Sequence, residues 1–250
     1  FGVIRPLTHR IGEQILHGDY EKAVMTYVGL AFPHETEEVR RVRTAFMDTR
    51  DTAVALRELP VHMSFERSML SYLHARPEDY AGALQQLPPK LLSMFVSAFQ
   101  SYLFNCALSH RLSEGHTLTD PVAGDRLIFV NGRTDAVTTA NIPAVTLHLA
   151  RGRCNIALFM PGKDEMDAIT GNDAIRDILA DMQITADDFR RASTFVKTKF
   201  DGAWRSISLK TSIDASVEGT NVHLKFTLPP GHYATTVCRE YMKADPIRMV

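Results

Sequence analysis

The sequence predicts an α+β protein in which helices and strands occupy separate stretches of the chain. The first half is mainly helical in pattern and is interrupted by four prolines, Pro60, Pro77, Pro88 and Pro89. Strand patterns follow over residues 117–160 and return over residues 203–228. We find no internal repeat and no regular alternation of strand and helix, so a parallel sheet built from βαβ units is not expected.

The composition is that of a folded chain with an ordinary core. Of the 250 residues, 45% are hydrophobic and 23% are charged, which argues against disorder. The formal net charge of -1 excludes a strongly basic protein, although local clusters of Arg and Lys could still contact nucleic acid. The chain has three well-separated cysteines and no C-x-x-C pair, so we expect reduced thiols in the cytoplasm rather than disulfides or a zinc site: Cys106, Cys154 and Cys238.

Three long helices are expected in the first half, over residues 8–28, 34–59 and 89–112. The third is the most distinctive, because it has the length of a membrane span yet carries several polar residues. We therefore expect a buried helix and no membrane association. An apolar stripe runs along one face, with Leu91, Phe95, Phe99, Tyr102 and Cys106. A second stripe is small and uncharged, with Ser93, Ser97, Ser101 and Asn105. The second stripe predicts tight packing against another backbone or, as the alternative, a partly wet cleft.

The second half predicts hairpins and further helix. Asn131-Gly132 indicates a hairpin turn, and "NIALFMPG" after it is an apolar strand. Residues 172–192 are helical in pattern, with Asp187 and Asp188 near a helix start. Apolar residues then alternate with polar ones on a strand that we expect to bury one face, at Val222, Leu224, Phe226 and Leu228.

The loop "PGKDEMD" at residues 161–167 is the most tempting chemical motif. Asp164, Glu165 and Asp167 could serve as the acid and base of a hydrolase if their environments separated their pKa values. A solvated polar loop is the more common meaning of such a cluster. No metal-ligand spacing, phosphate-binding loop or nucleophile elbow accompanies it. Basic pairs are scattered along the chain, and the sequence does not show whether they converge on one cleft.

The stretch "LPPGHYATTVCRE" at residues 228–240 joins a strand to a helix. Pro229 ends the strand, Gly231 relaxes the turn, and Thr235 or Thr236 is expected to cap a helix whose Val237 and Tyr241 face the core. The geometry presents the ring of Tyr233 at the end of a sheet. Such a ring is either a core aromatic or a platform on which an extruded base stacks.

Several stretches together resemble the TruD family of RNA pseudouridine synthases. They are "FG" with "RPLTHRIGE", then "SFERSMLSYL", "LPPKLLSMFVSAFQSYLFN" and finally "LPPGHYATTVCRE". The stretches follow the order of the family and span nearly the whole chain. The resemblance implies a cytoplasmic, monomeric isomerase that converts a tRNA uridine, uridine 13 of the D arm, to pseudouridine. It also implies a flipped base, an aspartate nucleophile, and neither cofactor nor metal.

The resemblance further implies a split catalytic domain. Residues 1–30 and 203–250 would belong to that domain, and residues 31–202 to a family-specific insertion. The nucleophile of the family lies in a Gly-x-Lys-Asp motif upstream of the Phe-Gly that appears here as Phe1-Gly2, so we expect it before residue 1 and expect this chain alone to be inactive. Asp164 imitates the motif but follows Phe1-Gly2 in the chain, and it is not assigned the catalytic role.

The residues carried over from the family are candidates for substrate binding. Tyr233 matches the aromatic that packs against the target base. Arg239 is expected to meet a phosphate or another active-site group, with Glu240 orienting it. Three weaker candidates are Arg205, Gln100 and Asn105; for Gln100 and Asn105 the alternative is a purely structural role. A noncatalytic RNA-binding module of the same fold is the alternative function.

Overall fold

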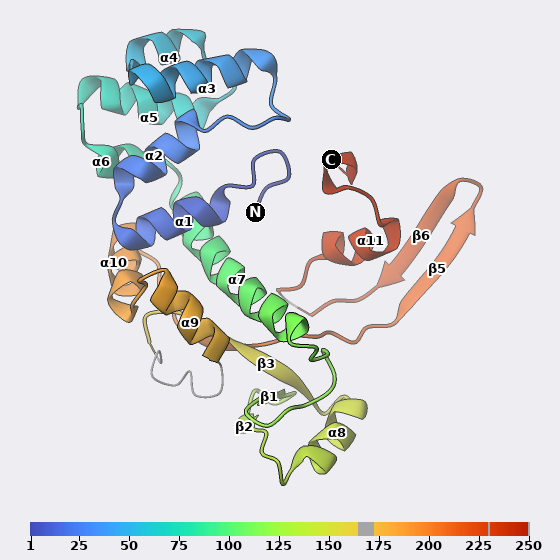
Figure 1. Ribbon diagram of the computed structural model, residues 1–250. Coiled ribbons are helices and arrows are strands. Elements are labelled where there is room, and N and C mark those ends of the chain that lie inside the picture. Colours follow the sequence, from blue (N-terminus) through green and yellow to red (C-terminus); the bar gives the residue numbers. More distant parts are fainter. Residues whose placement is uncertain (165–172, 230, 250) are drawn as a thin grey trace.

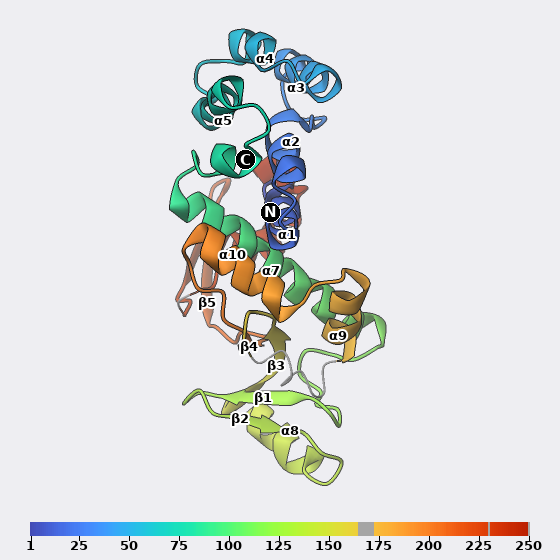
Figure 2. The same cartoon turned by 90° about the vertical axis from the view of Figure 1, so that its left-hand side faces the viewer.

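The long helix α7 (Pro89–Ser113) is the axis around which the other elements of the computed structural model are arranged (Figure 1). The structure describes residues 1–164, 173–229 and 231–249. Turned by 90°, the molecule is elongated, with α3–α5 at one end and α8 at the other (Figure 2). Pro89 occupies the first turn of α7, where no amide donor is needed. The predicted helix over 89–112 is confirmed, and Gly115 follows its end with a φ of 81°.

The helix expected over residues 8–28 is two helices, α1 (Thr8–His17) and α2 (Tyr20–Gly29). Gly18 ends α1 in a left-handed conformation with a φ of 74°. The side chain of Asp19 then caps α2 by accepting a hydrogen bond of 3.0 Å from the amide of Lys22. The apolar periodicity runs through both helices, which is why the sequence pattern did not show the break.

The helix expected over residues 34–59 is also broken, into α3 (Glu37–Thr49) and α4 (Thr52–Glu58). Arg50 adopts a left-handed φ of 58°, and Asp51 caps the amides of α4. Two further helices, α5 (Ser64–Ala75) and α6 (Tyr80–Leu84), complete this end of the molecule. In Figures 1 and 2 these helices form a bundle that continues from α2.

A four-stranded antiparallel sheet follows α7, with strand order β2-β1-β3-β4. Its strands are β1 (Arg126–Phe129), β2 (Thr134–Ala136), β3 (Cys154–Met160) and β4 (Ala203–Ser206). The Asn131-Gly132 turn joins β1 to β2, as predicted. The apolar strand expected over residues 155–162 is β3, which is mostly buried in the centre of the sheet.

Three helices accompany this sheet. The sequence pattern missed α8 (Ile142–Ala150), whose short apolar run does not distinguish helix from strand. The region 172–192, expected to be helical, contains α9 (Asp173–Asp181) and most of α10 (Ala186–Val196). Asp187 and Asp188 lie in the first turn of α10, as expected. Although partial burial opposes the shift, hydrogen bonds from Thr185 and Arg191 lower the pKa of Asp188.

The C-terminal part departs furthest from the expectation. The hairpin of β5 (Ile213–Glu218) and β6 (Asn221–Phe226) is a separate two-stranded sheet, and it projects from the body (Figure 1). The predicted alternation is present, because Leu224, Phe226 and Leu228 are half-buried between exposed polar residues, but the face is not fully buried within this chain. Val222 is 61% exposed, and Val217 on the partner strand is 74% exposed. No other described strand pairs with the hairpin to cover them.

The last helix, α11 (Ala234–Met242), has no buried residue, so Val237 and Tyr241 do not face a core. It begins at Ala234 with Tyr233 as its N-cap residue, and the predicted cap at Thr235 or Thr236 is therefore wrong. A short 3₁₀ helix, Pro246–Met249, follows. Mixed helices and antiparallel sheets confirm the α+β class.

Candidate functional site

Arg205 connects three distant parts of the chain. It lies on β4, and its guanidinium carbon is 5.3 Å from the ring centroid of Phe104 on α7. Its Nη2 atom also donates a hydrogen bond of 3.5 Å to the carbonyl oxygen of Gly231. A guanidinium over an aromatic face is held by electrostatic attraction. Arg205 therefore fastens the turn before α11 to the sheet and to α7, rather than pointing freely to solvent.

Tyr233 follows this turn and is 69% exposed. Its backbone is extended, with φ -112° and ψ 122°, and it forms the N-cap of α11. Gly231, two residues earlier, has a φ of 84°, which a residue with a side chain rarely adopts. The ring is thus displayed at the strand-to-helix junction, and the alternative of a core aromatic is wrong within this chain.

Within the described residues, Glu240 forms its ion pair with Lys243 and not with Arg239. The carboxylate of Glu240 accepts a hydrogen bond of 2.5 Å from the ammonium of Lys243, the C-cap residue of α11. This contact lowers the pKa of Glu240. Both Arg239 and Lys243 are exposed, so α11 presents two cationic side chains close to Tyr233 in sequence.

Gln100 is a structural residue in this chain. It is 4% exposed, and its Nε2 atom donates to the carbonyl oxygens of Pro161 at 2.7 Å and Asp201 at 3.5 Å. Because a buried amide needs such partners, Gln100 joins α7 to the chain segments at the ends of β3 and β4.

Asn105 lies on an exposed, uncharged face of α7. Ser97 and Asn105 are exposed and Ser101 is half-buried, with its hydroxyl donating to the Ser97 carbonyl oxygen at 3.0 Å. The prediction that this small stripe packs tightly against another backbone is wrong. Another helix approaches the backbone of α7 closely at Phe95 instead. A Cβ atom at Gly12 of α1 would lie only 2.1 Å from the carbonyl oxygen of Phe95. The wet-cleft alternative fits the observed face.

An aromatic group that the sequence pattern did not single out borders this face. The ring of His9 stacks on the ring of Tyr102, with ring centroids 4.8 Å apart. The ring centroid of Phe1 lies 4.7 Å from that of His9. Burial lowers the pKa of His9, and the hydrogen bond with Cys106 raises the pKa of Tyr102. In the sequence, these three residues had in common only that they occur in stretches that resemble the TruD family, namely "FG", "RPLTHRIGE" and "AFQSYLFN".

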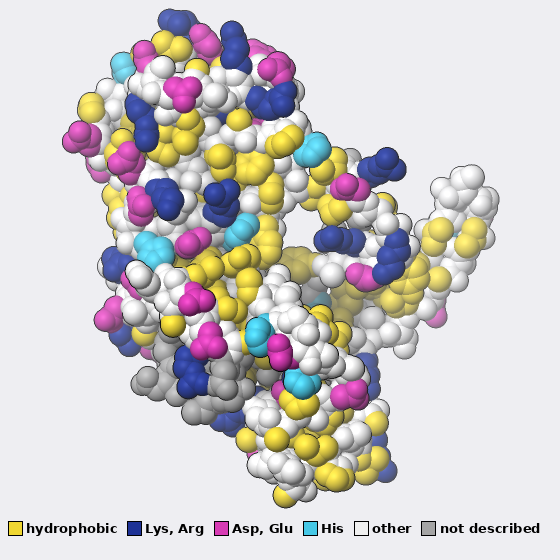
Figure 3. Space-filling view, in the orientation of Figure 1, with side chains coloured by type: hydrophobic (Ala, Val, Ile, Leu, Met, Phe, Trp, Pro, Cys, Tyr) yellow, Lys and Arg dark blue, Asp and Glu magenta, His cyan; other side chains and the backbone are white. Residues whose placement is uncertain are grey.

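The space-filling view shows an opening between the body and the C-terminal arm formed by α11 and the β5–β6 hairpin (Figure 3). Hydrophobic side chains gather on the body side, and Lys and Arg side chains on the arm (Figure 3). We call Tyr233, Arg205 and the exposed face of α7 the candidate site, because Arg205 contacts both α7 and the turn before Tyr233. It combines a displayed aromatic ring, cations and an uncharged wall, which is a set suited to a nucleotide.

A buried ion network supports the body but does not reach the candidate site. Arg43 is 1% exposed and lies 2.9 Å from a carboxylate oxygen of both Glu35 and Glu66. Arg5 lies 3.3 Å and 3.4 Å from the same two oxygens. Burial and the neighbouring Arg43 lower the pKa of Arg5 to about 10, which still leaves it charged at neutral pH. Sequence spacing could not reveal this network, because its members come from distant segments.

Of the carboxylate cluster in the loop at residues 161–167, the structure describes only Asp164. The ammonium of Lys163 lies 3.3 Å from Asp201 and 3.7 Å from Asp164, whose side chain is exposed. Glu165 and Asp167 lie outside the described residues. Within residues 1–164, 173–229 and 231–249, no group of three His, Cys, Asp or Glu side chains is placed to hold a metal ion.

An Arg205→Met variant is expected to loosen the turn that carries Tyr233. Methionine keeps much of the packing on Phe104 but loses the donor to Gly231 and the cation–π contact. Amide hydrogen exchange of residues 231–233 should then accelerate roughly fivefold or more, since about 1 kcal/mol of local stabilisation is lost. Unchanged exchange there would show that Arg205 does not hold the turn.

Three comparisons with known proteins bear on this arrangement. The family model of tRNA pseudouridine synthase D (TruD) matches residues 1–241. The chain is 33% identical over 264 residues to the "Probable tRNA pseudouridine synthase D" of Methanococcoides burtonii, covering all of this chain and 60% of that protein. It is 37% identical to the protein of the same description from Natronomonas pharaonis, covering 98% of this chain and 58% of that one.

A crystal structure of a TruD protein from Methanosarcina mazei has the same fold. It superposes with a TM-score of 0.83 at 32% identity, covering 99% of this chain and 61% of that chain. The chain thus spans about 60% of the length of the relatives that it matches. The family match extends over nearly all the described elements, including the turn with Tyr233. The chain belongs to the TruD family of tRNA pseudouridine synthases.

Proposed function

We propose that the protein is an RNA pseudouridine synthase that converts a tRNA uridine, uridine 13 of the D arm, to pseudouridine. The reaction is an isomerisation: the glycosidic bond breaks, the uracil turns, and it is rejoined through carbon. The nucleophilic aspartate is assigned to a segment before Phe1, since the described residues offer only the exposed Asp164 in a Lys-Asp context. Accordingly, residues 1–250 alone are expected to bind RNA without turnover.

The exposure of the Tyr233 ring at the N-cap of α11 is the single observation that carries the proposal. A base removed from its stack loses its neighbours, and an aromatic ring replaces them. Tyr233 offers such a ring, fixed by its N-cap position and by the turn that Arg205 holds. Arg239 on the following helix is exposed and available to a backbone phosphate.

The proposed catalytic domain includes residues 203–250 together with residues 1–30, and the insertion comprises residues 31–202. The exposed valines of the β5–β6 hairpin support the assignment of this hairpin to the catalytic domain, because such a surface is normally covered within a domain. Residues 203–206 form β4, which pairs with β3 of the proposed insertion. The first 30 residues share a core with the rest of the body, since α1 packs along α7. The proposed boundary near residue 30 is therefore not marked by a break in packing.

The proposed partner is tRNA, and the protein is proposed to act in the cytoplasm as a monomer without cofactor. Within the described residues, α7 alone is long and apolar enough to cross a membrane. Its side chains Phe95, Phe99 and Leu103 are buried in the protein core instead. A core helix of this kind supports the proposal that the protein does not act in a membrane.

A Tyr233→Ala variant of the full-length protein tests the function. Base stacking on an aromatic contributes about 1–3 kcal/mol, so we expect turnover to fall roughly fivefold to 150-fold while the fold is retained. Tritium release from tRNA labelled at uridine C5 measures the turnover, and Tyr233→Phe should preserve most of it.

Tyr241→Ala is the matched control, since Tyr241 lies on the same helix and is 49% exposed. It should leave turnover within about twofold of the unmodified enzyme, in line with an ordinary surface substitution. Equal turnover in the Tyr233→Ala and Tyr241→Ala variants would contradict the role of Tyr233. Specific tRNA binding with no isomerisation by the full-length protein would instead favour a noncatalytic RNA-binding module.

A further inference from the structure

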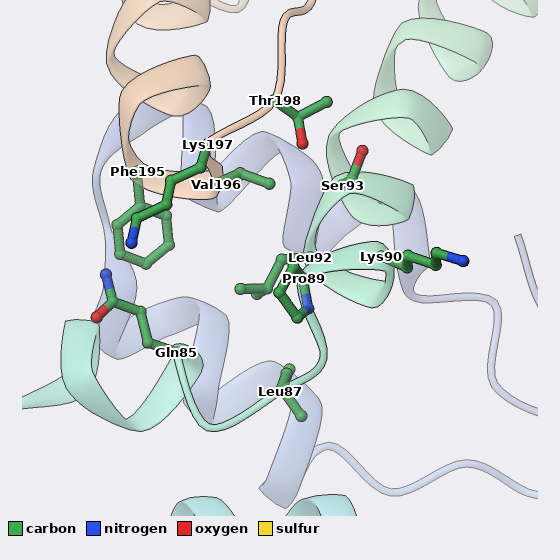
Figure 4. Close-up of a pocket in the computed structure, with 10 residues that line it drawn as sticks. All are labelled: Gln85, Leu87, Pro89, Lys90, Leu92, Ser93, Phe195, Val196, Lys197 and Thr198. Carbon is green, nitrogen blue, oxygen red and sulfur yellow. The ribbon is translucent and has the colours of Figure 1, made fainter.

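A pocket of about 440 Å³ lies between the start of α7 and the end of α10 (Figure 4). Figures 1 and 2 place α10 on the side of the body away from α11, so this pocket is separate from the candidate site. Its volume falls within the range of small-molecule sites in proteins. The proposed reaction does not use it, although Leu87 to Ser93 of its lining belong to the stretch "LPPKLLSMFVSAFQSYLFN".

The floor of the pocket is apolar and rigid. Leu87, Leu92 and Val196 are buried there. Phe195 is held in place by stacking on Tyr20, with ring centroids 4.3 Å apart and planes inclined by 23°. A fixed, partly exposed ring next to aliphatic side chains suits a flat apolar group more than a hydrated ion.

Polar groups stand at two edges of this floor. Figure 4 shows Lys197 and the amide of Gln85 directed toward one another over Phe195. The hydroxyls of Ser93 and Thr198 approach one another at the other edge, whereas Lys90 points away (Figure 4). Within the part of the chain that the structure describes, the ammonium of Lys197 makes no ion pair of 4.0 Å or less.

We propose that this pocket binds a nucleoside monophosphate unit. The phosphate would meet Lys197 and the Gln85 amide, which supply a positive charge and a neutral donor. The base would lie on the apolar floor beside Phe195, with its polar edge at Ser93 and Thr198. The unit is either one nucleotide of an RNA or a free nucleotide, and the RNA source rests on the proposed function.

Calorimetric titration with uridine 5′-monophosphate, uridine and ribose 5-phosphate tests the chemistry. We expect saturable binding of the monophosphate at millimolar concentrations or below, and weaker binding of both fragments. The Lys197→Gln variant should bind the monophosphate roughly tenfold to hundredfold more weakly, because it loses a hydrogen bond from a charged group. Lys199→Gln is the matched control, since this exposed lysine lies two residues away and does not line the pocket.

The source is decided by protection of Lys197 from an amine-modifying reagent. Protection by tRNA identifies an RNA nucleotide, and protection by the monophosphate alone identifies a free nucleotide. Absence of monophosphate binding, equal effects of the two lysine variants, or equal affinity for a fragment would overturn the proposal. Because the titration needs no turnover, a failure of the pseudouridine synthase assignment would leave this result standing.

Discussion

An Arg43→Met variant is expected to lose about 3–5 kcal/mol of its free energy of unfolding, because it removes one member of a buried ion network. The Arg43 side chain is almost fully buried and pairs with Glu35 and Glu66. It also donates to the carbonyl oxygens of Val28 at 2.5 Å and Tyr27 at 3.1 Å. Methionine fills most of the volume but donates to none of these acceptors. Arg5 is then the one remaining cation for both Glu35 and Glu66. Chemical denaturation measures the change.

Arg41→Met is the matched control, on the same helix two residues earlier. The Arg41 side chain is 69% exposed, and its ion pair with Glu58 is 3.6 Å long. An exposed pair of this kind contributes about 0–1 kcal/mol. A double variant that carries Arg43→Met and Glu66→Gln should be less destabilised than the sum of its parts, since Arg5 and Glu35 then remain as one balanced pair. Equal stability of the Arg43→Met and Arg41→Met variants would show that the network does not stabilise the fold.

A Gly12→Ala variant is expected to lose about 3 kcal/mol of unfolding free energy, at the upper end of the usual cost of overpacking. A Cβ atom at Gly12 would lie 2.1 Å from the carbonyl oxygen of Phe95 and 2.9 Å from the Cβ of Phe99. The first of these is backbone in the middle of α7, which cannot move without displacing the whole helix. The loss exceeds the roughly 1 kcal/mol that alanine gains in helix propensity.

Gly29→Ala provides the control for this substitution. Gly29 is also helical, but its added Cβ would meet the Sδ atom of Met47 at 2.6 Å. Met47 is flexible and 38% exposed, so it can turn aside. We expect a change below about 1 kcal/mol at this position. A Gly12→Ala variant as stable as Gly29→Ala would mean that α1 and α7 can separate without loss.

Local chemistry explains what the sequence predicted. The β1–β2 hairpin follows from Asn131-Gly132, and the start of α7 follows from Pro89 in its first turn. The breaks at Gly18 and Arg50 were missed, because one apolar period continues through each pair of helices. Their local signals were a glycine and the capping residues Asp19 and Asp51.

The candidate site was only partly visible in the sequence. Tyr233 could be singled out because a proline-glycine turn places it at a strand-to-helix junction. The contact of Arg205 with Phe104 could not be foreseen, since it depends on how β4 lies against α7. The hydrogen bond from Gln100 to the Pro161 carbonyl oxygen could not be foreseen either, because the sequence does not reveal whether a polar residue on a helix faces solvent or a buried carbonyl.

The crossing of α1 and α7 at Gly12 also bears on the order of folding. During synthesis α1 emerges from the ribosome long before α7, so its apolar face has no partner while the intervening helices form. Contacts between segments so far apart in the chain are made late and set the folding rate. The helices of residues 37–84 can gather through near neighbours, whereas closure of α1 onto α7 has to wait for the chain to lengthen.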